Sequence, residues 1–223
     1  MFAALVSAWV GAGVTAGLLG RDRRPTLPAL PVAHRAVSAT TLTSSLTPSV
    51  FGRPVSFTAT VTVVAPGHEV PTGTVRFTDG STPLGTVAVS SGRAVLSTAD
   101  LHGGAHTVVA AYSGDADVAS STGSVGQRVV PAPTRLVGSP VALAAFQLSA
   151  MLTRADTGTP VTGRTVEMSV GGAVLCRGVT GNNGTARCNG IGGALEVLLN
   201  KGYTATFTGD SDYGPSSGQG VLI

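Results

Sequence analysis

Apolar and polar residues alternate along several short stretches of the chain, which is the period of a β-strand with one buried face. The clearest stretch is residues 55–63, where every second residue from Val55 is apolar and the others are serine or threonine. Residues 74–78 and 106–112 show the same period. The pattern predicts strands whose core-facing residues are Val55, Phe57, Ala59, Val61, Val63, Val75, Phe77, Val108, Ala110 and Tyr112.

The alternating pattern restarts after the short proline linker of residues 131–133. It predicts two more strands with buried positions at Phe146, Leu148, Ala150, Leu152, Val166, Met168 and Val170. A strand followed by a Gly-Asp turn occurs in both halves, as HTVVAAYSGDADV and as GYTATFTGDSDY. This correspondence aligns Tyr112 with Phe207, and we expect both to lie in a core. The chain is therefore predicted to be a tandem repeat.

Turn signals such as Asp79-Gly80 separate the predicted strands at intervals of about eight to twelve residues. We expect residues 84–89 to pair with residues 93–97. In the second half we expect residues 173–179 to form a hairpin with residues 185–188. About seven short strands in the first half are typical of an antiparallel β-sandwich.

The blocks TTLTSS, GRPVSFTATV, PTGTVRFTDG, LGTVAV, GRAVLST and GGAHTVVAAYSGD follow one another in order through most of residues 39–130. Together they resemble a bacterial immunoglobulin-like (Ig-like) repeat domain. In the second half the resemblance rests mainly on TFTGDSDY and on the order of the elements. The resemblance implies an all-β fold of two tandem Ig-like antiparallel sandwiches, at 39–131 and 132–223, after an N-terminal hydrophobic segment and linker at 1–38. It also implies a stalk, spacer or adhesin module of a bacterial surface or secreted protein.

Composition agrees with many short strands and turns, because the 223 residues include 31 glycines and 13 prolines. Charged residues make up only 11% of the chain and the formal net charge is +3. Part of that charge comes from Arg21, Arg23 and Arg24, and no basic stripe with interleaved aromatics is present, which argues against a nucleic-acid partner.

The N-terminal segment Met1–Gly20 is uncharged and long enough to span a bilayer as a helix. It fits an export signal, with a small-residue cleavage site at Val37-Ser38-Ala39, or an uncleaved membrane anchor. The arginines that follow it would favour retention of the C-terminal side in the cytoplasm. We expect a secreted or cell-surface protein that touches a membrane only if residues 1–20 remain attached.

Cys176 and Cys188 are the only cysteines and flank the predicted turn about equally. Placed in this way, they are expected to face each other across two antiparallel strands and to form a disulfide. The alternative is a pair of buried thiols that pack as small hydrophobic side chains. A disulfide favours an oxidising compartment.

Two acidic pairs occupy the same predicted turn of each half, Asp115 with Asp117 and Asp210 with Asp212. Paired carboxylates on a loop are candidate Ca²⁺ ligands, although the spacing is not that of an EF-hand. We favour the alternative that these aspartates cap their own turns by accepting backbone N–H hydrogen bonds. They remain weak metal candidates.

No nucleophile–base set, metal cluster or phosphate-binding loop is visible in the sequence, so we expect no catalytic residues and no cofactor. Gly214–Gly218 matches the hydrolase pattern G-x-S-x-G by letters, but the strand–elbow–helix context is missing. The predicted function is a non-enzymatic extracellular or cell-surface structural or adhesion module. Its partner would be a cell-envelope or host surface protein or a glycan. The alternative is a carbohydrate- or Ca²⁺-binding accessory module of the cell envelope.

Overall fold

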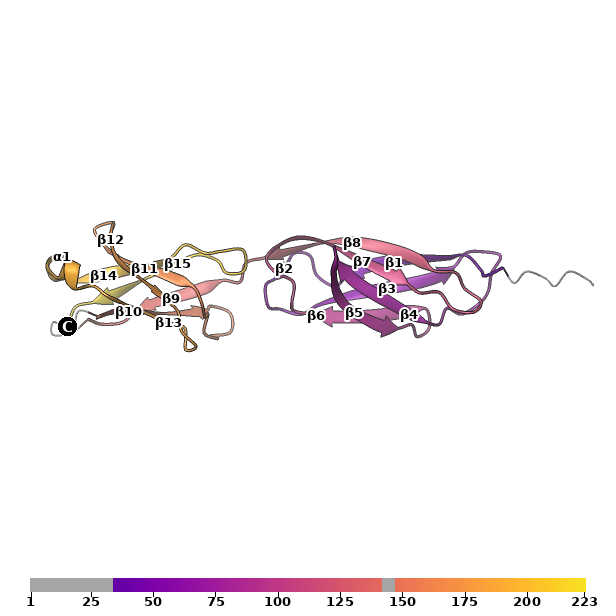
Figure 1. Cartoon of the computed structure of the whole chain (residues 1–223), viewed down its shortest axis with the longest axis horizontal. Coiled ribbons are helices and arrows are strands. Elements are labelled where there is room, and N and C mark those ends of the chain that lie inside the picture. Colours follow the sequence, from indigo (N-terminus) through magenta and orange to yellow (C-terminus); the bar gives the residue numbers. More distant parts are fainter. Residues whose placement is uncertain (1–33, 142–146) are drawn as a thin grey trace, which may run out of the picture. The chain divides into compact units, whose positions relative to one another are not determined.

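Strands dominate the computed structural model, which describes residues 34–141 and 147–223 (Figure 1). Within these residues four sheets pack as two sandwiches, and both belong to one compact unit, His34–Ile223. The predicted all-β class with two tandem sandwiches is confirmed. The predicted N-terminal hydrophobic segment, residues 1–20, and the buried position of Phe146 lie outside the described residues. The predicted cleavage site is described: Val37 is exposed, and Ser38 and Ala39 are the first residues of β1 (Ser38–Ser44).

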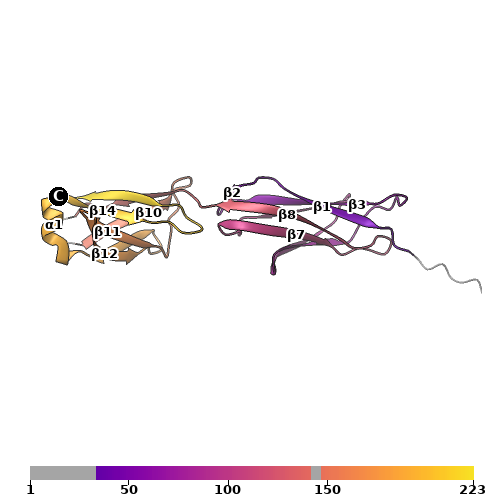
Figure 2. The same cartoon turned by 90° about the horizontal axis from the view of Figure 1, so that it is seen from above.

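The first sandwich places a three-stranded sheet in the order β1-β3-β6 against a five-stranded sheet in the order β2-β8-β7-β4-β5. Figure 2 shows neighbouring strands β7 and β8 side by side. The strands are β1 (Ser38–Ser44), β2 (Ser49–Val50), β3 (Val55–Val63), β4 (Thr74–Asp79), β5 (Thr82–Ala88), β6 (Arg93–Thr98), β7 (Gly104–Tyr112) and β8 (Ser121–Val130).

The alternating apolar residues of β3, β4 and β7 lie on the buried face of each strand, as predicted. Phe57 and Phe77 are fully buried, and Tyr112 is 2% exposed. Val63, at the end of β3, is only partly buried against the same cluster. The polar positions of β3 point away from the core because successive side chains of a strand alternate between its two faces.

The second sandwich places the sheet β13-β10-β9 against the sheet β12-β11-β14-β15. Its strands are β9 (Thr134–Gly138), β10 (Gln147–Arg154), β11 (Thr165–Val170), β12 (Ala173–Val179), β13 (Thr185–Asn189), β14 (Gly202–Phe207) and β15 (Ser216–Val221). The predicted core residues of β10 and β11 are buried, and so is Phe207. Each sandwich has its own cluster of buried apolar side chains.

Two predicted strand pairings are wrong, for one physical reason. β5 pairs with β4 and β6 pairs with β3, so residues 84–89 and 93–97 belong to different sheets. In the same way β12 pairs with β11, whereas β13 pairs with β10. The connection between each pair crosses from one layer of the sandwich to the other, and local turn signals do not distinguish such a crossing from a hairpin.

The disulfide Cys176–Cys188 is present, with Cα atoms 5.9 Å apart, but it does not join two strands of one sheet. Cys176 lies on β12 and Cys188 on β13, so the bond links the two layers of the second sandwich. The expectation of a cross-strand bridge within a hairpin is therefore wrong.

A short helical segment, η1 (Ile191–Gly193) and α1 (Ala194–Leu199), joins β13 to β14 and was not predicted. Val197 is buried in the core of the second sandwich, whereas Leu195 and Leu199 are exposed. Among the described residues, none of the helices has the length and apolar character needed to cross a membrane.

Candidate functional site

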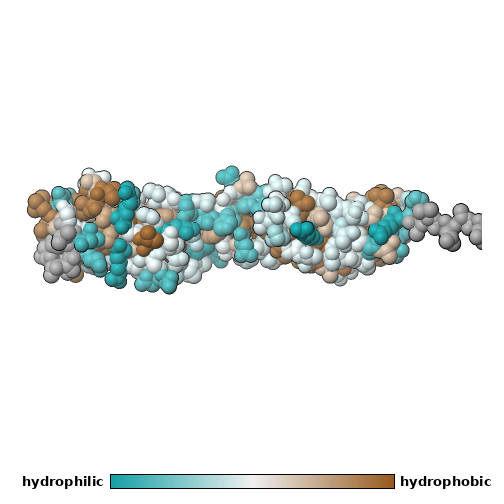
Figure 3. Space-filling view, viewed as in Figure 1, coloured by the Kyte–Doolittle hydropathy of each residue, from teal (hydrophilic) through white to brown (hydrophobic). Residues whose placement is uncertain are grey.

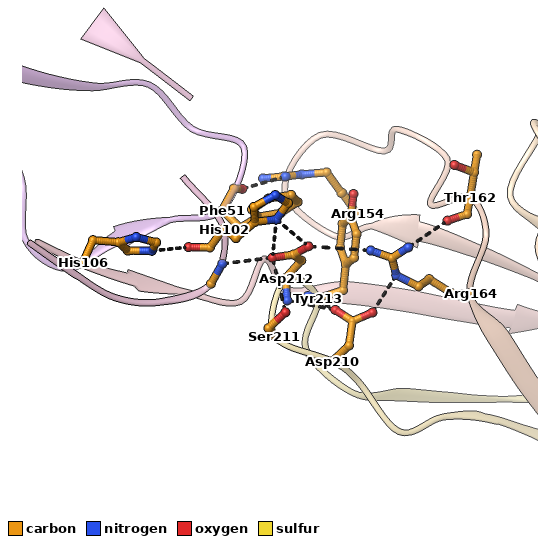
Figure 4. Close-up of polar contacts among 11 residues, drawn as sticks. Phe51, His102, His106, Arg154, Thr162, Arg164, Asp210, Ser211, Asp212 and Tyr213 are labelled. Carbon is orange, nitrogen blue, oxygen red and sulfur yellow. Dashed lines mark hydrogen bonds and ion pairs between the residues drawn. The ribbon is translucent and has the colours of Figure 1, made fainter. Parts of the chain in front are cut away.

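Polar side chains from both sandwiches meet at a junction within the unit His34–Ile223 (Figure 4). The first sandwich contributes the loop after β2, with Phe51 and Arg53, and the β6–β7 connection, with His102 and Gly103. The second contributes the end of β10 and the turn between β14 and β15, residues 208–215. Linker residue Ala132 is also fixed there, since its N–H donates to the carbonyl of Asp212.

Asp212 is the centre of the junction and is 7% exposed. Its carboxylate accepts the backbone N–H of Gly103 at 2.9 Å and lies 3.1 Å from Nδ1 of His102. Burial alone would raise the pKa of Asp212, but hydrogen bonds from Gly103 and His102, with the charge of Arg164, lower it below its ordinary value. The buried carboxylate of Asp212, in the second sandwich, therefore has its main hydrogen-bond partners in the first sandwich.

Gly103 permits this contact because its backbone lies against the turn of the second sandwich. A Cβ atom at position 103 would collide with the carbonyl oxygen of Ser211. Glycine is the one residue without a Cβ, so it lets two backbones approach this closely.

An aromatic and cationic cluster covers one side of the same junction. The Phe51 ring stacks on His102 with centroids 5.8 Å apart and meets the edge of Tyr213 at 5.3 Å. The guanidinium of Arg164 lies over the Tyr213 ring, 5.0 Å from its centroid. The backbone carbonyl of Phe51 accepts a hydrogen bond of 2.7 Å from Nη1 of Arg154.

Asp156 joins two arginines, one from each sandwich. Arg154 is 8% exposed and donates to both carboxylate oxygens, at 3.0 and 2.9 Å. Arg53 of the first sandwich donates to the same carboxylate at 3.1 Å. Hydrogen bonds from Arg154, opposed by partial burial and supported by Arg53, lower the pKa of Asp156 to about 2. Bidentate arginine–carboxylate pairs of this kind fix geometry as well as charge.

His106 holds the β6–β7 connection in place from within the first sandwich. Its Nδ1 lies 2.6 Å from the Asp79 carboxylate, and its Nε2 lies 2.8 Å from the carbonyl oxygen of His102. These two contacts tie the imidazole to the end of β4 and to the backbone of the β6–β7 connection. The two histidines thus act separately: His106 fixes the loop, and His102 reaches across the junction.

The four aspartates singled out in the sequence do not have equal roles. The Oδ1 atoms of Asp115 and Asp210 accept the backbone N–H groups two and three residues further on, which closes the same turn in each sandwich. Asp117 is exposed, whereas its counterpart Asp212 faces the other sandwich. Within the part of the chain that the structure describes, no group of three or more His, Cys, Asp or Glu side chains is placed to hold a metal ion.

The Asp115 turn is further tied to the core. Its Oδ2 atom accepts hydrogen bonds from the N–H and hydroxyl of Thr72, at 2.7 and 2.8 Å, and from the hydroxyl of Tyr112 at 2.9 Å. The two bonds from Thr72 are the main cause that holds the pKa of Asp115 well below its usual range. In the other turn, Ser216 of the G-x-S-x-G match begins β15, and its hydroxyl accepts a hydrogen bond from Thr134.

Residues 42–130 match the family model of the bacterial Ig-like domain (group 3). The first sandwich is a bacterial Ig-like domain. This confirms the resemblance seen in the sequence for that half of the chain. None of the curated proteins matches the sequence.

Several solved structures resemble the chain at low identity. The fibronectin(III)-like modules of Clostridium thermocellum CbhA share 16% identity with a TM-score of 0.31, over 82% of this chain and 93% of that one. A tetra-tandem repeat from the extending region of a large adhesion protein shares 15% identity with a TM-score of 0.43, over 84% of this chain and 49% of that one. The Yersinia pseudotuberculosis adhesin InvE shares 12% identity with a TM-score of 0.40, over 82% and 58%. Similarities at this level do not indicate a shared function.

The junction cannot be predicted from the sequence alone. His102 and Asp212 are 110 residues apart in the chain, and each belongs to a turn with an ordinary local explanation. The sequence holds one sign of a difference between the two Gly-Asp turns. In the second turn Asp212 is followed by Tyr213, whereas in the first turn Asp117 is followed by Val118.

Proposed function

We propose that this chain is a non-enzymatic module of the bacterial cell surface or extracellular space, which carries its Ig-like sandwiches as a spacer or adhesion unit. The observation that supports this most directly is the junction, where the buried carboxylate of Asp212 is bound to the backbone of Gly103 and to His102. Breaking that contact leaves a buried charge without its partners, which is costly. The junction therefore resists bending between the sandwiches.

The proposed compartment is supported by two features. Residues 42–130 belong to the bacterial Ig-like family. The second sandwich contains the Cys176–Cys188 disulfide, and such bonds persist outside the reducing cytosol. N-terminal sequencing of the protein from fractionated cultures tests the compartment, and a reduced protein confined to the cytoplasm would contradict the proposal.

The spacer mechanism is tested by distance measurements between one spin label on each sandwich. We expect a narrow distance distribution for the native chain and a broad one for Gly103→Ala, because the added Cβ collides with Ser211. Gly126→Ala on β8 is the matched control, since a Cβ at that position meets no atom within 4 Å. A broad distribution in the native chain, or equal distributions in both variants, would contradict a stiff junction.

The adhesion role requires a partner, which we propose is a cell-envelope or host surface protein or a glycan. Pull-down with the full chain from cell-envelope extracts tests it. If no partner is enriched over a resin that carries no protein, the adhesion role is rejected and the spacer role stands alone.

A further inference from the structure

Three leucines on α1 form an exposed apolar surface, the α1 patch. Leu195 is 64% exposed, Leu199 is 74% exposed and Leu198 is 38% exposed. Figure 3 shows apolar side chains gathered over α1 and neighbouring β12. A six-residue helix that buries only Val197 has no local reason to carry three outward leucines, and clustered exposed apolar residues mark interaction sites.

A second apolar surface lies on the first sandwich, beside the β3–β4 loop. A groove of about 470 Å³ there is lined by Val37, Val64 and the chain at 65–67. Val37 is 64% exposed and Val64 is 47% exposed, and neighbouring Val70 is 69% exposed. We call this surface the β3–β4 groove.

The charges around the two surfaces are complementary. The α1 patch is flanked by Glu196 on the helix and Lys201 just after it, and both are exposed. The β3–β4 groove is bordered by Arg35 and Glu69. Each surface thus offers one cation and one anion beside apolar side chains, and Glu196 can face Arg35 while Lys201 faces Glu69.

The chain's own junction provides a precedent for this contact. There the β6–β7 connection of the first sandwich meets the β14–β15 turn of the second. In the second sandwich β14 pairs with β11 and β15, and in the first sandwich β7 pairs in the same way with β4 and β8. β14 is therefore the counterpart of β7. The β13–β14 connection, which contains α1, is the counterpart of the β6–β7 connection. The groove lies at the β7–β8 turn, since Ala36 is bonded to Asp117. That turn is the counterpart of the β14–β15 turn.

We propose that the α1 patch docks in the β3–β4 groove of a second copy of this chain, in the form that retains residues 34–37 at the edge of the groove. The contact joins different surfaces on the two copies, so it is head-to-tail and does not close on itself. Repeated contacts of this kind build open chains of molecules. In each contact between copies, the β13–β14 connection meets the β7–β8 turn, and these are the counterparts of the two segments that meet at the junction within one copy.

Sedimentation velocity of the full chain over a wide concentration range tests the proposal. We expect concentration-dependent association, lost in Leu199→Glu because a carboxylate replaces an apolar contact. Val95→Glu is the matched control: Val95 is 52% exposed on the outer face of β6 and should leave association unchanged. A native chain that is monomeric at every concentration would overturn the proposal, as would undiminished association of Leu199→Glu, which would assign association to another part of the chain.

Charge reversal tests the orientation of the contact. Glu196→Arg and Arg35→Glu should each weaken association roughly tenfold, because each places like charges opposite one another. The double variant restores an opposite pair and should recover most of the loss. Failure of the double variant to exceed the single ones would refute the pairing. If the native chain is monomeric but floats with lipid vesicles, and Leu199→Glu does not, the patch is a lipid contact and the proposal is wrong.

Discussion

Reduction of the Cys176–Cys188 disulfide should destabilise the second sandwich and leave the first unchanged. The two cysteines are 12 residues apart in sequence and lie on different sheets. In the chain-entropy account, closing a loop of this length stabilises the folded state by about 3 kcal/mol. For a domain of this size each kcal/mol shifts the melting temperature by roughly 4–8 °C, so the expected fall is roughly 12–24 °C.

Differential scanning calorimetry of the full chain with and without a thiol reductant measures this effect. The first sandwich is an internal control, because both cysteines of the chain lie in the second. We expect two transitions, since each sandwich has a separate core, and only one should move. A single transition would show that the sandwiches unfold together. A shift below about 4 °C would refute the chain-entropy account for this bond.

Three further predictions concern single side chains. Phe77→Ala removes a fully buried ring and should lower the free energy of unfolding of the first sandwich by about 3–5 kcal/mol, measured by urea denaturation. Tyr112→Phe removes the hydroxyl bond to Asp115 and should cost roughly 1.5–3 kcal/mol; the native tyrosine should resist ionisation in an ultraviolet titration, since burial first and then Asp115 raise its pKa to about 12. The folded-state pKa of Asp156, about 2, is below that of an unfolded carboxyl, so its stabilising effect is complete above about pH 4 and is lost as the pH falls through about 2. Asp156→Asn should flatten the acid limb of a plot of melting temperature against pH, and an unchanged limb would contradict the Arg154 contact.

Alternation along the chain predicted most of the core residues on β3, β4, β7, β10 and β11. Val75, Phe77, Val108 and Met168 are all fully buried, as their period-two spacing requires. The reason is local. A strand that buries one face places an apolar residue at every second position, and this spacing can be read from the sequence without knowledge of the fold.

Strand partners could not be predicted in the same way. β5 and β6 are separated by a turn that suits a hairpin, yet they lie in different layers, and the same holds for β12 and β13. The free energy that selects the layer comes from burying each strand's apolar face against residues distant in sequence. The cysteine pair was recognised from its spacing, but only the layering showed that it joins two sheets.

By itself, the sequence determined the fold class, the tandem repeat and the core residues of the most regular strands, because each follows from periodicity and from recurring blocks. The tertiary structure alone decided which turn aspartate has a partner in the other sandwich. Asp115 and Asp210 close their turns with backbone groups two and three residues away, whereas Asp212 is satisfied by Gly103 and His102, more than a hundred residues earlier. A contact of that kind depends on close approach of two backbones, and no local pattern of residues encodes it.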